Sequence, residues 1–380
     1  MDAADYLRRK GTDAPLEVLR AEVEAAFRSF EEAAAACPRG LRTRKPNART
    51  WSPAELVDHL VVTGEAGLGE LRSLLRGERP AGEPVPAHLR SETVAPWETL
   101  LARLRQLHAE VLAAIAVNAP HEVRTPTVMV VEGREWLEEL DWKAYVQALF
   151  RVHTAQHRKQ LRRIVGTLAR VTLPTARYVL VPVGGNDGTN GTNRTNGTNG
   201  TTATGTDAAD HGSPIRPISP IGPIRPIVPP DGADDAAVLH DLWTDPGVRR
   251  YLFDDRVLTP EETAAYLDLS AQSFEVHGAG LWLVKDAAGS GDAVGFAGLL
   301  SNALLFGVRP SHWGQGIAFE AATAVLEHAR TDLQVDRVVA DVDEPNAVSV
   351  HVLEKLGMRR VKRDIVDGKS LLYYELRLQV

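Results

Sequence analysis

Hydrophobic residues in about the first 170 positions recur at the three- and four-residue spacing that marks one face of a helix. The sequence SPAE at residues 52–55 forms a capping box with proline at the first helical position, which predicts that a second helix begins there. We expect a third helix over about 96–111 and a fourth that begins near Arg134 and continues through Ile164. The periodic positions of the first helix are Leu16, Leu19, Val23, Phe27 and Phe30. Together these helices predict an all-α four-helix bundle over residues 1–172.

The second half of the chain has a different rhythm, in which short β-rich runs alternate with stretches of helical periodicity. This alternation predicts a second domain of the α/β or α+β class, so the chain is expected to be multidomain. The β-rich runs are 281–284, 294–300, 304–308 and 335–342, and the helical stretches are 234–245, 260–275, 317–330 and 346–356.

Between the two halves lies a segment that is poor in hydrophobic side chains. Residues 184–210 consist mostly of Gly, Asn, Thr, Asp and Ala, and residues 214–230 are dense in proline and repeat the sequence PIRPI. The first stretch cannot bury enough surface to offset its ordering entropy, and the second favours an extended spacer, so we expect a coil over 184–213 followed by a stiffer linker. We therefore assign residues 173–218 to the linker and 219–380 to the second domain, and expect each domain to fold alone.

The composition is typical of a globular protein and narrows the classes of function. Hydrophobic residues make up 44% and charged residues 24%, which excludes a wholly disordered chain, and a formal charge of -7 argues against a nucleic-acid partner. The single cysteine, Cys37, excludes an intrachain disulfide and thiolate zinc clusters. The sequence has no signal-peptide pattern and no run of about 18 apolar residues, so we expect a cytoplasmic protein without a membrane partner.

Two histidines, His153 and His157, are four residues apart on the predicted fourth helix, so their side chains project from the same face. His59 lies at the edge of the apolar stripe of the second helix. Imidazoles from two helices that point into a bundle can form a three-nitrogen metal site with positions left for water or substrate. Histidine pairs at this spacing also occur in structural roles, and the spacing alone leaves both interpretations open. We interpret His108, beside another apolar stripe, as a structural or surface residue.

The sequences WSPAELVDHL (51–60) and HTAQHRKQL (153–161) together resemble the DinB-type four-helix bundle, over about residues 12–170. In that family a tryptophan-serine helix start precedes one histidine, and two histidines on the last helix complete the set of metal ligands. The resemblance implies a divalent ion, which for nitrogen ligands is zinc, nickel or iron. Some members of the family are metal-dependent thiol transferases or hydrolases. The implied ligands are His59, His153 and His157.

Residues 308–321 (VRPSHWGQGIAFEA) follow a predicted strand and open a predicted helix. Gly314 and Gly316 allow a tight turn and a close approach of the backbone to a ligand, and the free amides of a helix N-terminus favour a negatively charged group. The segment therefore has the properties of a pyrophosphate-binding loop. It lacks the glycine spacings of the P-loop and of the dinucleotide fingerprint, which argues against ATP and nicotinamide cofactors.

The sequence WGQGIA (313–318) resembles the acetyl-CoA signature of the GNAT acetyltransferases, with tryptophan where glutamine or arginine is usual. Residues 340–358 and 244–253 resemble the late strand–helix and the early substrate-side helix of the ribosomal-protein and antibiotic-modifying subgroup. The resemblance covers about residues 219–380 and implies a mixed central sheet that binds acetyl-CoA. The implied cofactor-binding residues are Val308, Trp313, Gly314, Gln315, Gly316, Ile317, Ala318, Asn346 and Ser349.

This resemblance implies acetyl transfer to a primary amine of a small molecule or a protein N-terminus, and it allows a homodimer. Two positions depart from the family pattern, because Leu353 stands where many members have a tyrosine acid and Ala303 stands where a carboxylate is common. Glu320 also fits a structural role at a helix N-terminus. The candidate catalytic residues are Glu320 and Ser349, with His312 and Asp343 as further candidates for a general base.

Three functions are consistent with these patterns. The first is an acetyl-CoA-dependent N-acetyltransferase with an appended metal-binding bundle. In the second, the bundle is a metal-dependent thiol transferase or hydrolase and the acetyltransferase half serves the same pathway. The third is a non-catalytic sensor that binds a CoA ester, an alternative that Leu353 and Ala303 keep open.

Overall fold

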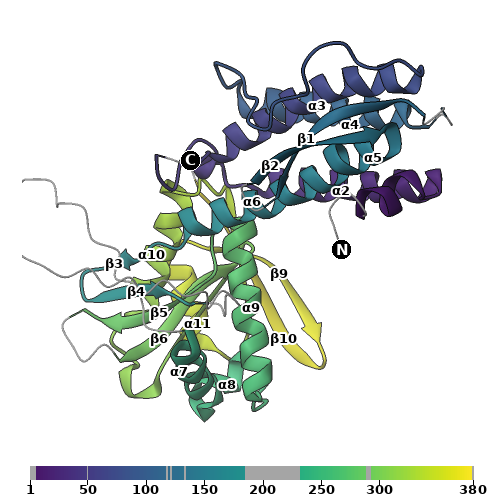
Figure 1. Cartoon of the computed structure of the whole chain (residues 1–380). Coiled ribbons are helices and arrows are strands. Elements are labelled where there is room, and N and C mark those ends of the chain that lie inside the picture. The colour runs from purple at the N-terminus through teal and green to yellow at the C-terminus, as the bar shows by residue number, and fades with distance from the viewer. Residues whose placement is uncertain are drawn as a thin grey trace, which may run out of the picture.

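The computed structural model describes residues 6–48, 50–116, 119, 122–131, 134–184, 232–287 and 292–378. It contains an elongated helical part and a part built on a β-sheet (Figure 1), which confirms the expected multidomain fold. The coil predicted for 184–213 lies, apart from Gly184, outside the described residues. No helix within the described ranges has the length and hydropathy that a membrane span requires.

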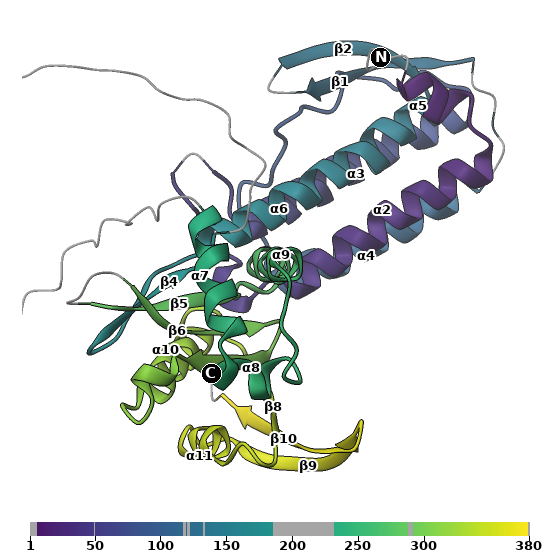
Figure 2. The same cartoon turned by 90° about the horizontal axis from the view of Figure 1, so that it is seen from below.

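The N-terminal part consists of long helices that lie side by side (Figure 2). The periodic positions face inward as predicted, since Leu19, Val23, Phe27 and Phe30 are all buried. The π-helical turn η3 leads directly into α6, the helix that carries two of the candidate metal ligands. The helices are η1 (Arg8–Thr12), α2 (Leu16–Ala36), η2 (Arg39–Leu41), α3 (Pro53–Leu75), α4 (Trp97–Ala114), α5 (Trp142–Val146), η3 (Gln147–Val152) and α6 (His153–Ala169).

Helix α3 begins where the capping box predicts. The Ser52 hydroxyl accepts a hydrogen bond from the Glu55 amide at 3.2 Å, and the Glu55 carboxylate accepts one from the Ser52 amide at 2.8 Å. Pro53 occupies the first helical position, where a backbone N–H has no helical partner to lose. These contacts fix the start of the helix that carries His59.

The prediction that the fourth helix begins near Arg134 is wrong, because a hairpin precedes the helical run. Strand β1 (Arg124–Val131) pairs with β2 (Arg134–Asp141) in an antiparallel hairpin. The threonines and valines of β1 favour a pleated strand, because their branched side chains restrict χ1. The helical run starts only after β2, because the Asp141 carboxylate caps it by accepting hydrogen bonds from two backbone amides at 2.9 and 3.2 Å.

The C-terminal part is an eight-stranded sheet in the order β3–β4–β5–β6–β7–β8–β10–β9, with helices packed around it (Figures 1 and 2). Strands β7 and β8 are parallel and the other neighbours are antiparallel, so the sheet is mixed as expected. The strands are β3 (Leu173–Pro174), β4 (Tyr178–Pro182), β5 (Leu281–Asp286), β6 (Ala293–Leu300), β7 (Ala303–Val308), β8 (Arg337–Asp343), β9 (Arg359–Val366) and β10 (Lys369–Arg377). The helices are α7 (Gly232–Thr244), α8 (Pro246–Leu252), α9 (Pro260–His277), η4 (Pro310–His312), α10 (Ile317–Thr331) and α11 (Ala347–Lys355).

The predicted domain boundaries need correction, because β3 and β4 belong to this sheet. Strand β4 pairs with β5, with Leu180 opposite Val284, and Leu180 is fully buried. Residues 173–182, which we assigned to the linker, therefore form part of the second domain. The segment 185–231 lies between β4 and α7, within the second domain instead of before it.

One hydrophobic core runs through both parts of the molecule. It includes Phe30 and Leu56 from the helical part and Trp282 and Val325 from the sheet part. The indole N–H of Trp282 donates a hydrogen bond to the Val171 carbonyl, at the end of α6, at 2.8 Å. The two parts are therefore joined by buried contacts as well as by the chain.

The junction also depends on a glycine in η2. The Gly40 amide donates to the Leu333 carbonyl at 3.3 Å, and a Cβ at Gly40 would lie 1.9 Å from the Asp332 carbonyl oxygen. Arg44 pairs with the Asp332 carboxylate at 3.5 Å beside this contact. Any larger residue at Gly40 would push the two parts away from each other.

We predict that residues 1–184 and 232–380, co-expressed as separate fragments, assemble into one complex, because β4 pairs with β5 and the core is shared. The fragment 219–380 lacks β3 and β4, so it should be insoluble or unfold at a temperature lower by about 10 °C or more. Affinity purification through a tag on one fragment, followed by thermal unfolding, measures both outcomes. Fragment 219–380 folding alone with the stability of the full chain would contradict this prediction.

Candidate functional site

Three histidine rings from two helices meet in the helical part. His59 lies on α3, and His153 and His157 lie one turn apart on α6. The Nε2 atom of His153 is 3.1 Å from Nε2 of His59 and 2.9 Å from Nε2 of His157. These separations are close to the edge of about 3.3 Å expected for a tetrahedron with Zn–N bonds of about 2.0 Å. Within the described chain, these residues form the one group of at least three metal-binding side chains.

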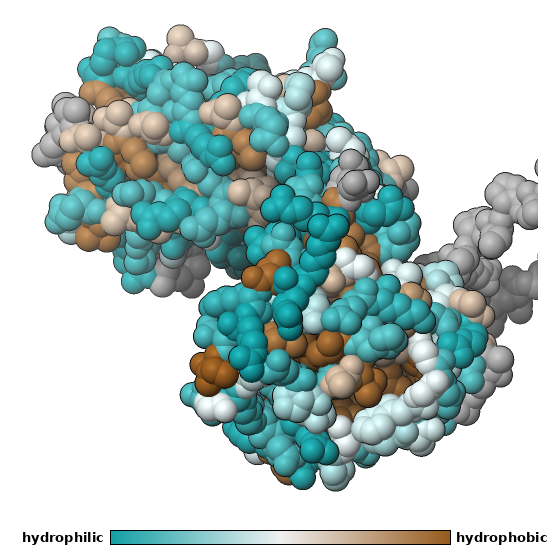
Figure 3. Space-filling view, turned by 180° about the vertical axis from the view of Figure 1, so that it is seen from behind, coloured by the Kyte–Doolittle hydropathy of each residue, from teal (hydrophilic) through white to brown (hydrophobic). Residues whose placement is uncertain are grey.

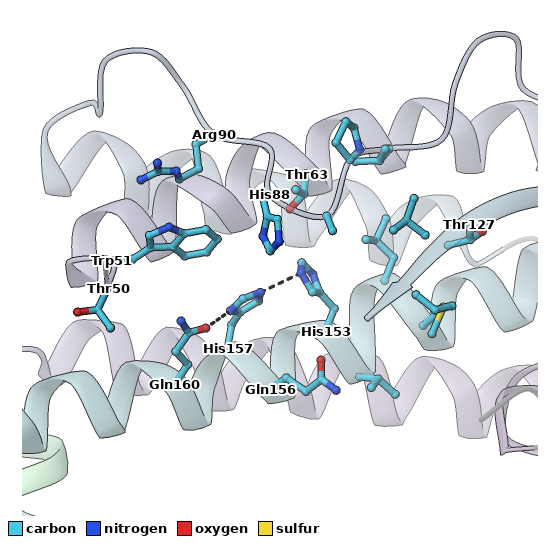
Figure 4. A pocket seen from close by; sticks show the side chains of 18 residues that line it. Thr50, Trp51, Thr63, His88, Arg90, Thr127, His153, Gln156, His157 and Gln160 are labelled. Atoms are coloured by element: carbon cyan, nitrogen blue, oxygen red, sulfur yellow. Dashed lines mark hydrogen bonds between the residues drawn. The ribbon is translucent and has the colours of Figure 1, made fainter. Parts of the chain in front are cut away.

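Hydrogen bonds at the opposite ring nitrogens determine where the lone pairs point. His59 Nδ1 lies 2.8 Å from the Leu89 carbonyl oxygen. His157 Nδ1 lies 2.8 Å from Gln160 Oε1, as Figure 4 shows. A carbonyl oxygen only accepts, so each Nδ1 carries the proton and each Nε2 carries a lone pair. The Nε2 atom of His153 can donate to one of these lone pairs but not to both. The donor set therefore fits a cation at its centre.

Burial keeps the three rings in the form that a metal requires. Desolvation lowers the pKa of His59 below its usual value and lowers the pKa of His157 to about 4. Burial also lowers the pKa of His153, and the neighbouring imidazoles lower it further. Because a metal binds neutral imidazole, no proton has to leave these rings at neutral pH before an ion binds.

A loop between α3 and α4 holds the site, although no periodic pattern in the sequence indicates this role. The Ser91 amide and hydroxyl each donate to the Asp58 carboxylate at 2.8 Å. The preceding residue, Arg90, pairs with the capping-box carboxylate at 3.0 Å, and the Leu89 carbonyl holds His59. Three successive loop residues are thus tied to α3, and these non-local contacts could not be read from the sequence.

A cavity of about 460 Å³ opens beside the histidines (Figure 4). Trp51 and Arg90 lie toward one end of it and Thr127 toward the other, with His88 between them. His88, which no sequence pattern indicated, lines the cavity but is not part of the three-histidine group. The apolar lining residues include Val85, Val128, Met129, Leu149 and Val152. The cavity therefore offers both polar and apolar surface to a ligand beside the histidines.

His108 has a structural role and is not a surface residue, which is one of the two interpretations that the sequence allowed. It is buried on α4, with Nδ1 2.5 Å from Glu31 Oε1. Its ring stacks on Phe27 with 3.7 Å between ring centroids. His108 is therefore a useful comparison for the histidines at the candidate metal site.

The predicted pyrophosphate loop connects β7 to α10. Gly314 and Gly316 have φ angles of 74° and 76°, in the left-handed region that favours glycine. Gly316 is the N-cap residue of α10, and no atom lies within 4 Å of a Cβ built at Gly314. The amides of the first turn of α10 have no acceptor within the helix and follow a glycine-lined loop, which fits a phosphate group.

Strands β7 and β8 separate beside this loop. They pair at one position, Ala303 with Val339, where the Val339 amide also donates to the Asn302 carbonyl at 2.9 Å. Because the strands are parallel, the loop before α10 and the start of α11 lie at the same edge of the sheet. The surface of the C-terminal part is hollowed, and hydrophobic residues line the hollow (Figure 3).

The predicted cofactor-binding residues fall at this edge of the sheet. One group runs from the end of β7 into the first turn of α10, where the Trp313 indole N–H donates to the Val308 carbonyl at 2.7 Å. The other group opens α11, where Asn346 Oδ1 accepts a hydrogen bond from the Ser349 amide at 3.3 Å. These contacts shape the backbone at both places, and their role toward a cofactor remains a prediction.

Glu320 does not have the surroundings of a general base, contrary to our expectation. Its carboxylate accepts hydrogen bonds from the Thr175 hydroxyl at 2.6 Å, the Arg177 amide at 2.9 Å and Arg177 Nε at 2.8 Å. Burial alone would raise the pKa of Glu320, but these hydrogen bonds outweigh it and lower the pKa below its usual value. The partners come from the turn between β3 and β4, which we had assigned to the linker.

Asp343 has surroundings better suited to a base. Burial is the largest effect and raises its pKa above the usual value, although Lys369 opposes the change. It is the last residue of β8, at the edge of the sheet described above. His312, a further candidate for a general base, lies in η4 with Nδ1 2.9 Å from the Ser311 hydroxyl, and Leu353 is buried.

The comparisons with known proteins agree with this two-part organisation. Residues 226–359 match the family described as acetyltransferase (GNAT) domain, and residues 21–161 match the DinB superfamily. The uncharacterized protein YkkB of Bacillus subtilis (strain 168) is 28% identical over 155 residues, which are 37% of this chain and 86% of YkkB. The uncharacterized N-acetyltransferase p20 of Bacillus licheniformis is 26% identical over 156 residues, which are 37% of this chain and 83% of p20.

Solved structures are also similar to the C-terminal part. A GNAT-family acetyltransferase from Bacillus anthracis is 23% identical, with a TM-score of 0.32 and coverage of 38% of this chain and 89% of that one. A spermidine N-acetyltransferase from Vibrio cholerae, solved with CoA and spermine, is 17% identical, with a TM-score of 0.34 and coverage of 38% and 90%. The two family matches give the conclusion directly: the chain joins a domain of the DinB superfamily to a GNAT acetyltransferase domain, which makes it an enzyme of the N-acetyltransferase class.

Proposed function

We propose that the C-terminal domain transfers the acetyl group of acetyl-CoA to a primary amine, on a small molecule or on a protein N-terminus. The observation that carries the proposal is the glycine loop at the start of α10, at the carboxyl ends of two separating parallel strands. In this reaction the amine nitrogen attacks the thioester carbonyl carbon of acetyl-CoA, the C–S bond breaks, CoA leaves as the thiolate, and the nitrogen loses a proton.

The protein contributes mainly binding and orientation. Backbone amides of Gly316, Ile317 and Ala318 have no acceptor within the helix and are available to phosphate oxygens. The edge of β7 beyond Ala303 is not paired with β8 in the described structure, so an extended ligand can bind along it as an added strand does. Holding the amine and the thioester together in one place accounts for much of the acceleration in such a reaction.

We assign Asp343 as the acceptor of the amine proton. Burial raises the pKa of the Asp343 carboxyl, which makes its carboxylate a stronger base than that of an exposed aspartate. Glu320 is committed to Arg177 and does not serve here. Ser349, whose amide donates to Asn346 Oδ1 at the start of α11, stays a proposed cofactor-binding residue.

We further propose that His59, His153 and His157 bind one divalent ion, and that zinc, nickel or iron suits their nitrogen ligands. The converging Nε2 lone pairs support this proposal. The bound ion supplies a Lewis acid that activates a thiol or a water molecule. The cavity beside it then makes the DinB domain a candidate thiol transferase or hydrolase, with the acetyltransferase domain serving the same pathway.

We predict that Gly316→Val weakens CoA binding by more than about tenfold, because a β-branched residue does not adopt the left-handed φ that shapes the loop. Calorimetric titration with CoA measures the effect. Gly368→Val is the matched control, since Gly368 has a φ of 79° and open space around it but lies in the β9–β10 turn. Equal affinities in the two variants would contradict the assignment of the loop.

For Asp343→Asn we predict a fall in kcat of about a hundredfold with an unchanged dissociation constant for CoA, because only the proton acceptor is lost. In the wild type, the rate should fall as the pH drops through the raised pKa of Asp343, since the protonated form cannot accept a proton. Asp341→Asn, two residues away on β8, is the control. A panel of primary amines assayed with acetyl-CoA provides the rates. CoA binding without turnover of any amine would favour the sensor function instead.

For the helical domain we predict that His157→Ala loses most of its bound metal whereas His108→Gln retains it. Three ligands are needed to hold the ion, and His108 is bonded to Glu31 outside the group. Metal content by mass spectrometry on protein purified without a histidine tag gives the result. The domain should stay folded without metal but unfold at a lower temperature, because an ion that binds the native state stabilises it. Substoichiometric metal in the wild type would assign the histidines a structural role.

A further inference from the structure

Arg177, in the turn between β3 and β4, contacts the loop that we assign to CoA. Its Nη2 atom donates to the Gln315 carbonyl at 3.0 Å and lies 2.7 Å from the Glu320 carboxylate. Its Nε atom donates to the same carboxylate at 2.8 Å. Arg177 lies outside the segment 226–359 that matches the acetyltransferase family, so no comparison assigns it a role.

The contact with the Gln315 carbonyl fixes the direction of one backbone amide. In a trans peptide the carbonyl and the following N–H point in opposite directions, so holding the Gln315 oxygen turns the Gly316 N–H away from Arg177. Glycine adopts either sign of φ, so the peptide between Gln315 and Gly316 can flip at little cost when nothing holds it. A flipped peptide would present a carbonyl oxygen instead of an N–H on the side opposite Arg177.

Arg177 also compensates a charge that is unfavourable at a phosphate site. Glu320 lies in the first turns of α10, and its side chain is only 18% exposed, so solvent screens it poorly. An unpaired carboxylate there would repel the phosphates of CoA. The guanidinium forms two contacts with this carboxylate and is itself half exposed. Its Nη1 atom makes no hydrogen bond within the described residues.

We propose that Arg177 is a positioning residue of the CoA site, which orients the Gln315–Gly316 peptide and neutralises Glu320 beside the bound phosphates. The inference rests on the proposed binding of CoA at this loop. Glu320, which we first considered as a base, then acts as the partner that holds Arg177 in place. The segment just after the helical domain thereby becomes part of the acetyl-CoA site.

The test compares CoA affinity in four proteins by calorimetric titration: the wild type, Arg177→Ala, Glu320→Gln and the double variant. Arg177→Ala should weaken CoA binding about tenfold, since it releases the peptide and leaves a carboxylate unpaired. The double variant should recover part of this loss, because it has no unpaired carboxylate. Glu320→Gln alone should weaken CoA binding less than Arg177→Ala does, because Arg177 keeps its contact with the Gln315 carbonyl and no carboxylate is left beside the phosphates.

Two further measurements separate this role from a purely structural one. The loss in Arg177→Ala should shrink as ionic strength rises, because salt screens the repulsion between Glu320 and the phosphates. In turnover assays the KM for acetyl-CoA should rise with little change in kcat. Arg103→Ala is the matched control, since Arg103 forms a similar pair with Glu65 at 2.7 Å in the helical part.

Each result decides a different point. Failure of the wild type to bind CoA would refute the proposed function itself. Binding in the wild type with unchanged affinity in Arg177→Ala would overturn the inference and leave the function standing. No recovery in the double variant would overturn the charge compensation. If Arg177→Ala does not fold, Arg177→Lys is measured in its place. Lysine keeps the positive charge but lacks the planar guanidinium group that contacts both Gln315 and Glu320. An unchanged affinity for CoA in Arg177→Lys would then refute the inference.

Discussion

The pairing of β4 with β5 joins the two parts of the molecule into one body. Strand β4 follows α6 after a short turn through β3, and its partner β5 lies on the other side of the segment 185–231. Leu180 and Trp282 place this edge of the sheet in a core that continues into the helical bundle. The last helix of the DinB-type domain is therefore held at its C-terminal end by the sheet of the acetyltransferase domain.

This junction bears on both candidate sites. Helix α6 carries His153 and His157 and ends at the chain that leads into β3. The next turn of the chain carries Arg177, which contacts the loop before α10. Two ligands of the proposed metal site and one residue that contacts the proposed cofactor loop thus lie on one continuous stretch of polypeptide. Strands β3 and β4, which lie outside both family matches, thus connect the two domains.

Local chemistry made much of the helical part predictable. The capping box at Ser52 and the spacing of His153 and His157 depend on residues close in sequence, so the start of α3 and the shared face of α6 followed from the sequence. The wrong assignments involve partners far away. Strand β4 has only five residues beside a glycine-rich segment, and its partner lies beyond that segment. The surroundings of Glu320 were not predicted, because its partner Arg177 is distant in sequence. Similarly, nothing near His59 in the sequence indicates the Leu89 carbonyl that orients its ring.

The position of the segment 185–231 also determines how long β4 waits for β5 while the protein is synthesised. The ribosome completes β4 at Pro182 and reaches β5 at Leu281 only after the intervening residues. At a synthesis rate of about 5–20 residues per second, the edge of β4 stays without its partner for roughly 5–20 s. During that interval the helical part is followed by an apolar strand with one unpaired edge, which is the kind of edge that recruits other chains. Nascent chains of this protein therefore have a defined window for aggregation or for protection by a chaperone.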